Sequence, residues 1–458
     1  MKKNILLFVL FTMSNAFAQE HFGGITTSSR VGILNAGLNP SELANLSSKF
    51  EFQFVSTSVN VSNNKISVKD ITGGKDLKDL IFADKEVVNF NIDAEISGPG
   101  LAIKMLGFGF AITSKANVKA NLSNVDPTLA DALSNSGFNS ILGLTNISST
   151  ENQRINATAW GEIGLSVAHK IYKNESHSVN GGVSFKLLFP GSYANIGARN
   201  FKGTVVNSAG NLELTDASTS LNMAYSGNLN NSFVDFSDYT KFSSIYGKLG
   251  GMVGDVGIDY QYKPEGGKYK LKIGASIKDI GSMTFKKEGN YSNDYNLSIT
   301  GTQHLNLNQF QNVTTISQVE DILKIEDANG NINFTESNYS KDFVVKLPTT
   351  LNLYADIKLF PKMSITAFMR QKLNKDSEND QIISQNSISI TPRFNLGFFE
   401  AFIPIAKNEI SGTATGFGFR LGGFFIGSNS AVTALMNNSK QVDIYTGFRF
   451  GILGSKNK

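Results

Sequence analysis

Apolar and polar residues alternate at every second position through most of the chain from about residue 49 onward. In the stretch FEFQF, phenylalanines alternate with Glu51 and Gln53, and the stretch YKLKIGASIK (269–278) places aliphatic side chains on one parity and lysines on the other. Because successive side chains of a β-strand point to opposite faces, this period predicts strands with one apolar and one polar face. About fourteen such segments occur, and many are about 10 to 18 residues long. A tilted strand needs roughly 9 to 11 residues to cross a bilayer, so this length favours membrane-spanning strands.

The connections between these segments fall into two classes. Four tight ones lie at 105–107, 173–176, 264–267 and 360–362, and four long ones rich in Asn, Ser and Asp lie at 62–86, 123–152, 207–240 and 286–342. Short turns at one end and long loops at the other are typical of outer-membrane barrels. No run of 18 apolar residues follows the N-terminal region, which excludes a helical membrane protein. We therefore predict an all-β fold, a transmembrane antiparallel β-barrel of about 14 strands (about 12 to 16) over residues 49–453. We expect an outer-membrane location with the short turns and both termini in the periplasm.

The first residues have the pattern of a secretory signal peptide over residues 1–18. Lys2 and Lys3 precede the apolar run Ile5–Met13, and Ala16-Phe17-Ala18 supplies the small residues of a cleavage site. A first transmembrane helix is the competing interpretation, but the apolar run is too short for it. The chain has no cysteine, which excludes a lipid anchor on cysteine and any disulfide bond.

Residues 19–48 are too long and too rich in Gly and Asn for a simple lead into the first strand. Because they enter just before the barrel closes, we predict a hatch-like plug, with a periplasmic arm as the alternative. Residues 454–458 are predicted to be a short periplasmic tail.

Two local irregularities interrupt the alternation. Apolar residues change parity across Gly98-Pro99-Gly100, which predicts a bulge or kink in the barrel wall, where a missing hydrogen-bond donor is tolerated. Within the long connection 286–342, apolar residues at 316, 319 and 323 have helical spacing, and Glu320 and Lys324 are four positions apart. This pattern predicts a short amphipathic helix.

Charged residues on the polar parity are expected to line the lumen. They include Asp255, Asp259, Lys270, Lys272, Lys278, Arg393, Arg420, Asp443 and Arg449. Pairing the strands on either side of 264–267 predicts Asp259 near Lys272 and Gln261 near Lys270. Both signs occur, so we favour a lumen of mutually paired charges over a single-sign, ion-selective pore.

Other chemistry finds little support. The net charge of +4 is spread evenly along the chain, so no nucleic-acid interface is expected. The four histidines are scattered and none has metal-ligand spacing. We expect no enzyme activity, no catalytic residues, no metal and no cofactor.

Two resemblances extend this interpretation. The stretch AGLNPSEL (Ala36–Leu43) resembles the Asn-Pro-Ala hatch motif of FadL-type hydrophobic-compound transporters, with Ser41 where those proteins carry Ala. The ordered blocks GDVGIDYQY, LKIGASIKDIGSMTF, VKLPTTLNLYADIKL, SISITPRFNLGFFEAFIPI, GFGFRLGGFFIGSN and VDIYTGFRFGILG resemble a family of Bacteroidota outer-membrane barrels of unknown function, over most of the chain after residue 36. The resemblance implies a FadL-like monomeric barrel with hatch residues Asn39, Pro40 and Leu43. It implies no substrate, because the ligand-binding motifs of FadL have no residue-by-residue match here.

We therefore predict a passive channel for hydrophobic or amphipathic small molecules, opened at Asn39-Pro40 and with Gly98, Pro99 and Gly100 as the site of lateral exit. The rival hypothesis is a sealed structural or accessory barrel of an envelope secretion or assembly complex. Expected partners are outer-membrane lipid, the barrel-insertion machinery and a hydrophobic small molecule.

Overall fold

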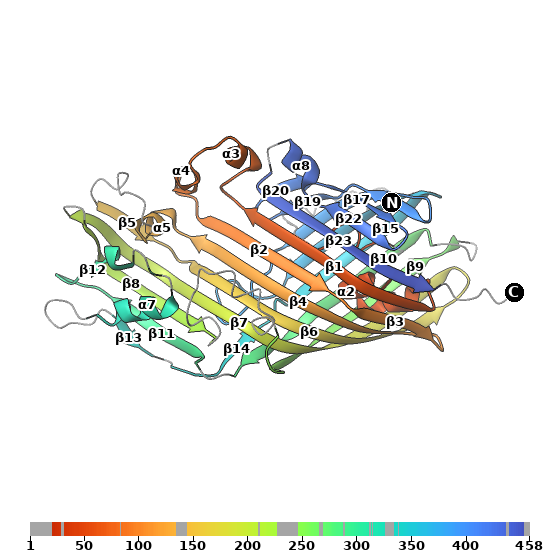
Figure 1. Cartoon of the computed structure of the whole chain (residues 1–458), viewed down its shortest axis with the longest axis horizontal. Helices are drawn as coiled ribbons and strands as arrows, with labels where there is room; N and C mark the ends of the chain where they lie inside the picture. The colour runs from red at the N-terminus through yellow and green to blue at the C-terminus, as the bar shows by residue number, and fades with distance from the viewer. Residues whose placement is uncertain are drawn as a thin grey trace, which may run out of the picture.

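The computed structural model describes residues 21–28, 32–82, 84–133, 144–208, 211–226, 246–264, 269–286, 289–310, 313, 315–325, 334–337, 339–436 and 439–452. The predicted signal peptide and the tail at 454–458 lie outside these residues. The strands form one antiparallel sheet that closes on itself, because β1 (Phe50–Asn63) pairs with β2 (Val88–Ser97) on one side and with β23 (Gln441–Ile452) on the other (Figure 1). Closure removes the unpaired edges that an open sheet would expose to lipid.

Fourteen strand positions follow one another around the wall. Several are built from consecutive short strands that share the same neighbour. In order they are β1; β2 with β3 (Gly100–Met105); β4 (Phe108–Val125); β5 (Leu144–Ser148) with β6 (Asn152–Lys173); β7 (His177–Ser208); β8 (Asn211–Tyr225) with β9 (Gly251–Tyr262); β10 (Leu271–Phe285) with β11 (Tyr291–Ser298) and β12 (Leu305–Asn306); β13 (Phe334–Glu336) with β14 (Phe343–Lys346) and β15 (Thr350–Phe360); β16 (Met363–Lys372); β17 (Ser387–Asn395); β18 (Phe399–Phe402) with β19 (Ile405–Asn408); β20 (Gly412–Thr415) with β21 (Phe417–Leu421); β22 (Phe424–Ser428); and β23. The predicted fold class and strand number are confirmed.

The two faces of the wall have opposite chemistry. On β10, Lys272 and Ser276 point inward and are buried, whereas Ile273 points outward and is 46% exposed. Exposed aliphatic and aromatic side chains recur on the outer face around the barrel, as at Val183 and Phe450. A soluble protein has the opposite arrangement, with apolar side chains inside and polar ones outside. The arrangement seen here suits a wall with lipid outside and polar groups inside.

The two ends of the barrel differ, and we name them by their connections. At the short-turn end, brief connections join β3 to β4, β6 to β7, β9 to β10, β15 to β16, β17 to β18 and β21 to β22, and β23 ends there. The opposite, long-loop end carries the helices α3 (Val68–Thr72), α4 (Leu77–Phe82), α5 (Pro127–Leu133) and α8 (Ala431–Leu435) (Figure 1). No helix of the described residues is long and apolar enough to cross a bilayer.

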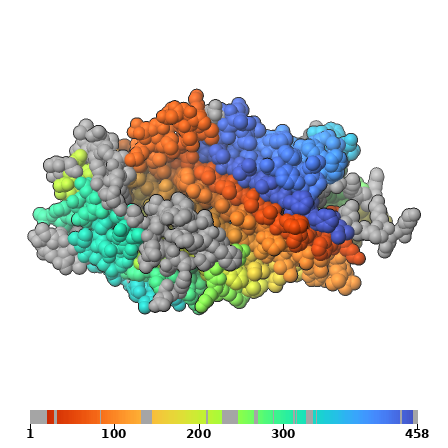
Figure 2. Space-filling view, viewed as in Figure 1, coloured from red at the N-terminus to blue at the C-terminus, as the bar shows by residue number. Residues whose placement is uncertain are grey.

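The predicted long loop at 207–240 is wrong in its first half, since residues 211–225 form β8. This strand pairs with β7 and β11 beyond the apolar outer band, where Thr and Ser on one face meet water and Leu212, Leu214 and Met223 on the other are fully or almost fully buried. β7 alone has 32 residues, so one side of the barrel rises far past the long-loop end (Figure 1). We call this region the extension; it comprises β5, β8, β11 to β13 and the outer half of β7, and its teal part lies at the left end of the molecule in Figure 2.

The extension has an apolar core of its own. The helix α7 (Ile316–Leu323) packs on that core through Ile316 and Leu323, and the short helix η5 (Leu307–Phe310) also contributes to it. The Lys324 ammonium lies 2.5 Å from the Glu320 carboxylate. The predicted amphipathic helix is thereby confirmed.

The N-terminal segment lies inside the barrel. The helix α2 (Gly32–Leu38) and the short 3-10 helix η1 (Pro40–Asn45) contact β1, β3, β4, β6, β7 and β9 toward the short-turn end (Figure 1). We call Gly32–Leu46 the hatch segment. It lies within the lumen rather than extending outside the barrel as an arm.

Candidate functional site

Three inward-facing glycines let the hatch segment approach the wall closely. A Cβ atom added to Gly109 would lie 2.2 Å from the Leu43 carbonyl oxygen, and one added to Gly182 would lie 2.5 Å from the Pro40 carbonyl carbon. At Gly257 it would lie 2.0 Å from the Asn39 side-chain oxygen. Atoms cannot approach that closely, so any larger residue at these positions would displace η1.

Asn39 fixes the start of η1. Its side-chain oxygen accepts hydrogen bonds from the Ser41 backbone N–H at 3.0 Å and from the Ser41 hydroxyl at 2.8 Å, which caps the helix. Its amide nitrogen donates to the carbonyl of Ile258 on β9 at 3.0 Å and of Ala275 on β10 at 3.3 Å. Pro40 follows at the first helical position, where its missing N–H costs nothing. The predicted hatch residues therefore hold the turn and attach it to the wall.

The strongest link between hatch segment and wall is a buried ion pair. The Glu42 carboxylate lies 2.7 Å from the Lys272 ammonium, and their side chains are 5% and 2% exposed. Glu42 also accepts hydrogen bonds from the Tyr354 hydroxyl and the Asn45 amide. Burial by itself would raise the pKa of the Glu42 carboxyl, but Lys272 and these hydrogen bonds outweigh burial and hold the pKa below its ordinary value.

The predicted register between β9 and β10 is wrong by two residues, although Asp259 and Lys272 still lie close enough for their charges to attract each other. In the observed register Lys272 lies opposite Gln261, and Asp259 lies opposite Gly274. Asp259 instead accepts hydrogen bonds from Asn180 at 2.8 Å and Asn45 at 3.0 Å. Lys272 is left to the hatch segment, which a comparison of neighbouring strands alone could not reveal.

Lys270 is also misplaced by the prediction. It precedes β10 in the connection at the short-turn end and is exposed, so it belongs to the rim and not to the lumen. Its backbone N–H donates to the carbonyl of Tyr262. Gln261 consequently has Lys272, not Lys270, as its cross-strand neighbour.

The apolar side chains of the hatch segment contact strands from the first part of the chain and strands from its last part. Leu43 and Ile33 pack with Ala111 and Ala168 on β4 and β6. Leu34 packs with a second cluster formed by Phe22, Ile25, Phe402, Phe425 and Tyr445, most of it on the last strands. The hatch segment therefore joins the first part of the wall to the last part.

Two charged groups of the wall reinforce this attachment. Glu51 on β1 accepts a hydrogen bond from the Ile33 backbone N–H at 2.9 Å, and its carboxylate lies 2.7 Å from Arg449 on β23. Glu400 accepts from the Ser28 hydroxyl at 2.8 Å and lies between Arg393 and Arg420, at 3.7 and 3.5 Å. These buried carboxylates connect strands to the N-terminal segment.

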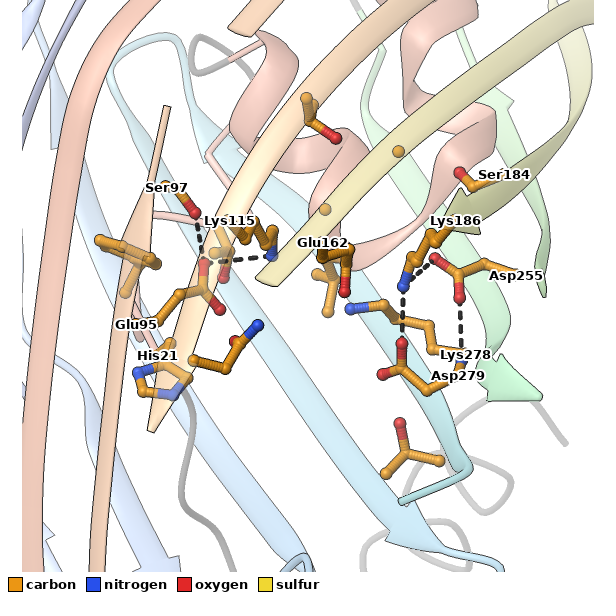
Figure 3. A pocket seen from close by; sticks show the side chains of 18 of the residues that line it. His21, Glu95, Ser97, Lys115, Glu162, Ser184, Lys186, Asp255, Lys278 and Asp279 are labelled. Carbon is orange, nitrogen blue, oxygen red and sulfur yellow. Dashed lines mark hydrogen bonds and ion pairs between the residues drawn. The ribbon is translucent and has the colours of Figure 1, made fainter. Parts of the chain in front are cut away.

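Above the hatch segment the lumen contains a cavity of about 160 Å³ (Figure 3). Its walls carry charges of both signs, most of them paired. The Lys186 ammonium lies 2.7 Å from Asp255 and 2.6 Å from Asp279, and Lys115 lies 3.1 Å from Glu95. The figure shows these pairs on opposite sides of the cavity.

A bulge in β10 turns the charged side chain of Asp279 into the cavity, although strict alternation would place it on the outer face. The register between β10 and β9 shifts between Ile277 and Ile280, and Asp279 has φ of +59°. Lys278 and Asp279 consequently both line the cavity although they are consecutive. Lys278 lies in the lumen as predicted; the unpredicted Asp279 pairs with Lys186.

The cavity has an apolar side as well. Its lining includes Phe22, Ile33, Leu34 and Leu38 of the N-terminal region and, from the wall, Trp160. The lining is therefore amphipathic.

Further toward the long-loop end, apolar side chains of the wall and a loop pack together inside the barrel. Leu188, Met283, Phe285 and Val345 form a buried cluster with Trp160. The loop at 373–386, between β16 and β17, adds the buried Ile382 to this cluster.

Arg154 holds that loop in place. It is fully buried and donates to the backbone carbonyls of Asn379 at 2.8 Å and Gln381 at 2.9 Å. Arg154 was not among the predicted lumen residues, because the loop that it binds was not predicted to fold inward.

The wall is interrupted at the predicted kink. β2 ends at Ser97 and β3 begins at Gly100, and the Gly98–Pro99 peptide is cis. Gly98 and Gly100 both line the cavity. The Gly98 N–H still donates to the Ser114 carbonyl at 2.8 Å, so the strand bends without separating from β4.

Asp443 is buried in the lumen but forms no ion pair in the described part of the chain. It accepts hydrogen bonds from the Asn429 backbone N–H at 2.7 Å and the Ser430 hydroxyl at 2.5 Å, which hold the turn before α8. Its role here is structural. No group of His, Asp or Glu among the described residues is arranged to hold a metal ion.

A closed wall of this kind, apolar outside and polar inside, defines an outer-membrane-type β-barrel. The chain belongs to the family of unknown function DUF5723, whose sequence profile matches residues 44–429. The prediction of a barrel family of unknown function is confirmed. No protein with curated annotation matched the sequence.

Several solved structures are similar in outline. The CymD monoaromatic hydrocarbon channel is 10% identical with a TM-score of 0.41, over 93% of this chain and 94% of that one. The P. putida toluene transporter TodX is 8% identical with a TM-score of 0.40, over 91% and 93%. The translocator domain of the autotransporter NalP from Neisseria meningitidis is 8% identical with a TM-score of 0.30, over 88% and 90%. The fold assigned above rests on the strand pairing of this chain.

Proposed function

We propose that this protein is a passive channel for small amphipathic molecules and that the hatch segment is its gate. The observation that carries the proposal is the cavity between the hatch segment and the wall kink. A ligand with a polar head and an apolar body can set its head against Lys115, Lys186 or Glu162 and its body along Leu34 and Leu38. A purely hydrophobic ligand would leave these charges without solvent, so the lining favours an amphipathic one.

For a ligand to cross the lumen, the structure must move on both sides of the cavity. The cluster around Trp160 and the loop 373–386 lie on the long-loop side of the cavity, and the hatch segment lies on the other. Gly98 and Gly100 border the cavity from the side, and the outer face there carries Phe54, which is 55% exposed. We propose that ligand leaves sideways at this kink into the bilayer.

The test is permeability of proteoliposomes. The variant without residues 32–46 and the wild type are compared for uptake of a short-chain zwitterionic amphiphile and of an uncharged sugar of similar size. The proposal expects deletion to raise amphiphile uptake, with a smaller effect on the sugar. Equal, unchanged permeability to both solutes in correctly folded barrels would refute it.

A control separates gating from damage to the barrel. Glu336 and Lys324 form an exposed ion pair in the extension, with side chains 48% and 49% exposed. The variant Glu336→Gln should leave both uptake rates unchanged. If it raises them as much as hatch deletion does, the assay reports general leakiness.

A sealed structural or accessory barrel is the second candidate. It is favoured by the paired charges and by the apolar cluster that fills the lumen beside Trp160. The extension would supply its contact surface. This alternative expects no change of permeability in any variant, and it expects a defined envelope partner to copurify with the full chain but not with a chain shortened in the extension.

We further propose an outer-membrane location for a monomeric barrel delivered by the barrel-insertion machinery, with the short-turn end in the periplasm and no enzymatic activity. Protease added to intact cells should then cleave the extension and spare the short turns.

A further inference from the structure

Three lysines project into the barrel at the short-turn end, beneath the hatch segment. Lys104 on β3 follows the inward Ala102, Lys170 on β6 follows the inward Ala168, and Lys263 lies just after β9. All three line a cavity of about 160 Å³ that is separate from the one above the hatch segment. We call these three residues the lysine mouth.

The lysine mouth has an excess of positive charge. Among the residues that the structure describes, no carboxylate lies within ion-pair distance of the three ammonium groups. The nearby Glu42 is paired with Lys272, and Asp259 already accepts hydrogen bonds from Asn45 and Asn180. The other lining residues include neutral polar groups such as Asn35, Ser47 and Gln261.

The three positive charges repel one another and are partly removed from water. Lys104 donates to the Leu46 carbonyl at 3.0 Å, which fixes one ammonium at the edge of the hatch segment. Burial, followed by the neighbouring Lys173, lowers the pKa of the Lys263 ammonium. Charged groups gathered in this way are stabilised by a counter-ion.

We propose that the lysine mouth is a binding site for a phosphate-class anion. Phosphate oxygens accept several charge-assisted hydrogen bonds at once, and three ammonium donors, from β3, from β6 and from the residue after β9, line the cavity. The cavity is large enough for a phosphate group with a small organic substituent. This site does not depend on the transport proposed above.

The same chemistry is offered by a soluble phosphate and by a phospholipid headgroup. The three side chains point into the barrel and not toward the lipid-facing outside, which favours the soluble anion. The position of the bound anion also affects the hatch segment, because Glu42 and Lys272 line the same cavity. A bound anion would lie next to the ion pair that holds the hatch segment to the wall.

The experiment measures binding of inorganic phosphate to the full-length protein at low ionic strength by isothermal titration calorimetry. The protein is reconstituted in nanodiscs of phosphatidylcholine alone, or of phosphatidylcholine with phosphatidylglycerol. The double variant Lys170→Met with Lys263→Met should bind phosphate at least about tenfold more weakly, since each removes a charged donor. The double variant Lys170→Arg with Lys263→Arg, which keeps both charges, should retain binding.

Lys362 supplies a matched control. It is exposed in the turn between β15 and β16 at the same end of the barrel and does not line the cavity. Lys362→Met should change the affinity by less than about twofold, because an exposed charge outside the cavity acts only through screened, long-range attraction.

The outcomes are distinct. Saturable phosphate binding that phosphatidylglycerol does not affect supports a soluble anion. Binding lost in phosphatidylglycerol discs, with that lipid retained by the wild type but not by the methionine variant in native mass spectrometry, supports a headgroup in the same site. Absence of saturable binding in both lipids, or equal weakening by Lys362→Met, overturns the proposal.

Discussion

The Glu42–Lys272 ion pair gives the sharpest prediction about the hatch segment. Replacing Glu42 by Gln keeps the volume of the side chain and can keep the hydrogen bond from Tyr354, but it leaves Lys272 without its counter-ion. Because both side chains are at most 5% exposed, solvent cannot compensate. Removing one partner of such a buried pair costs about 3 to 5 kcal/mol.

That cost applies to the docked state of the hatch segment. At the lower bound, about 3 kcal/mol corresponds to roughly a 100-fold larger undocked fraction, since each 1.4 kcal/mol changes an equilibrium tenfold. The double variant Glu42→Gln with Lys272→Met removes both charges. It should be far closer to wild type, because neither partner of the ion pair is left buried without the other.

The assay uses the absence of cysteine from the chain. Ala44 is fully buried within the hatch segment, so Ala44→Cys supplies a single thiol that reacts with a maleimide only when the segment leaves the wall. In this background Glu42→Gln should accelerate labelling about 100-fold. The exposed pair in the extension is the control: Glu336→Gln should change the rate by less than about twofold.

Two results would refute the reasoning. One is a labelling rate in Glu42→Gln within about threefold of the parent, since the ion pair would then contribute little to docking. The other is a double variant that labels as fast as the single one, because lost packing would then explain the effect and the buried charge would not.

Three further predictions concern the same lumen. Gly182→Val should raise the labelling rate of the same thiol more than tenfold while the barrel stays folded, as seen from its heat-modifiable migration on gels, because the added side chain overlaps η1. Docking should weaken as pH falls below about 4, since the pKa of Glu42 is lowered in the docked state: its stabilising charge is complete above its ordinary pKa and is lost as pH falls through the lower, shifted value; labelling with an acid-tolerant thiol reagent measures this. Arg154→Met should increase hydrogen–deuterium exchange in the loop 373–386 by at least about tenfold, because the Gln381 carbonyl loses its charged donor and the Asn379 carbonyl keeps only the Tyr193 hydroxyl.

The strands and their two faces were predictable because lipid and lumen impose opposite demands on alternate residues. Asp255 and Arg393 lie in the lumen for this reason. The bulge at Asp279 was not predictable, since a single extra residue reverses the parity that identified the strand. The sequence of β8 resembles a loop because its exposed Ser and Thr residues suit a sheet in water, where the outer face needs no apolar side chains.

The partners of charged lumen residues were harder to predict than their positions. Strand pairing brings residues close only across neighbouring strands, whereas the partner of Lys272 comes from the hatch segment 230 positions earlier in the chain. One signal was present: Glu42 is the only acidic residue between His21 and Lys49. An isolated acid in a segment expected to enter a lumen with many lysines is a reasonable candidate for a buried pair.

The position of Glu51 has a consequence for assembly of the barrel. β1 and β23 are the first and last strands to be synthesised, and they meet only when the barrel closes. Glu51 binds Arg449 across this seam and also accepts the Ile33 N–H that orients α2, while Leu34 packs on the late strands. The complete docking surface for α2 therefore exists only after the final strand has paired. Docking of the N-terminal segment would then be the last folding event, and it would lock the seam against reopening.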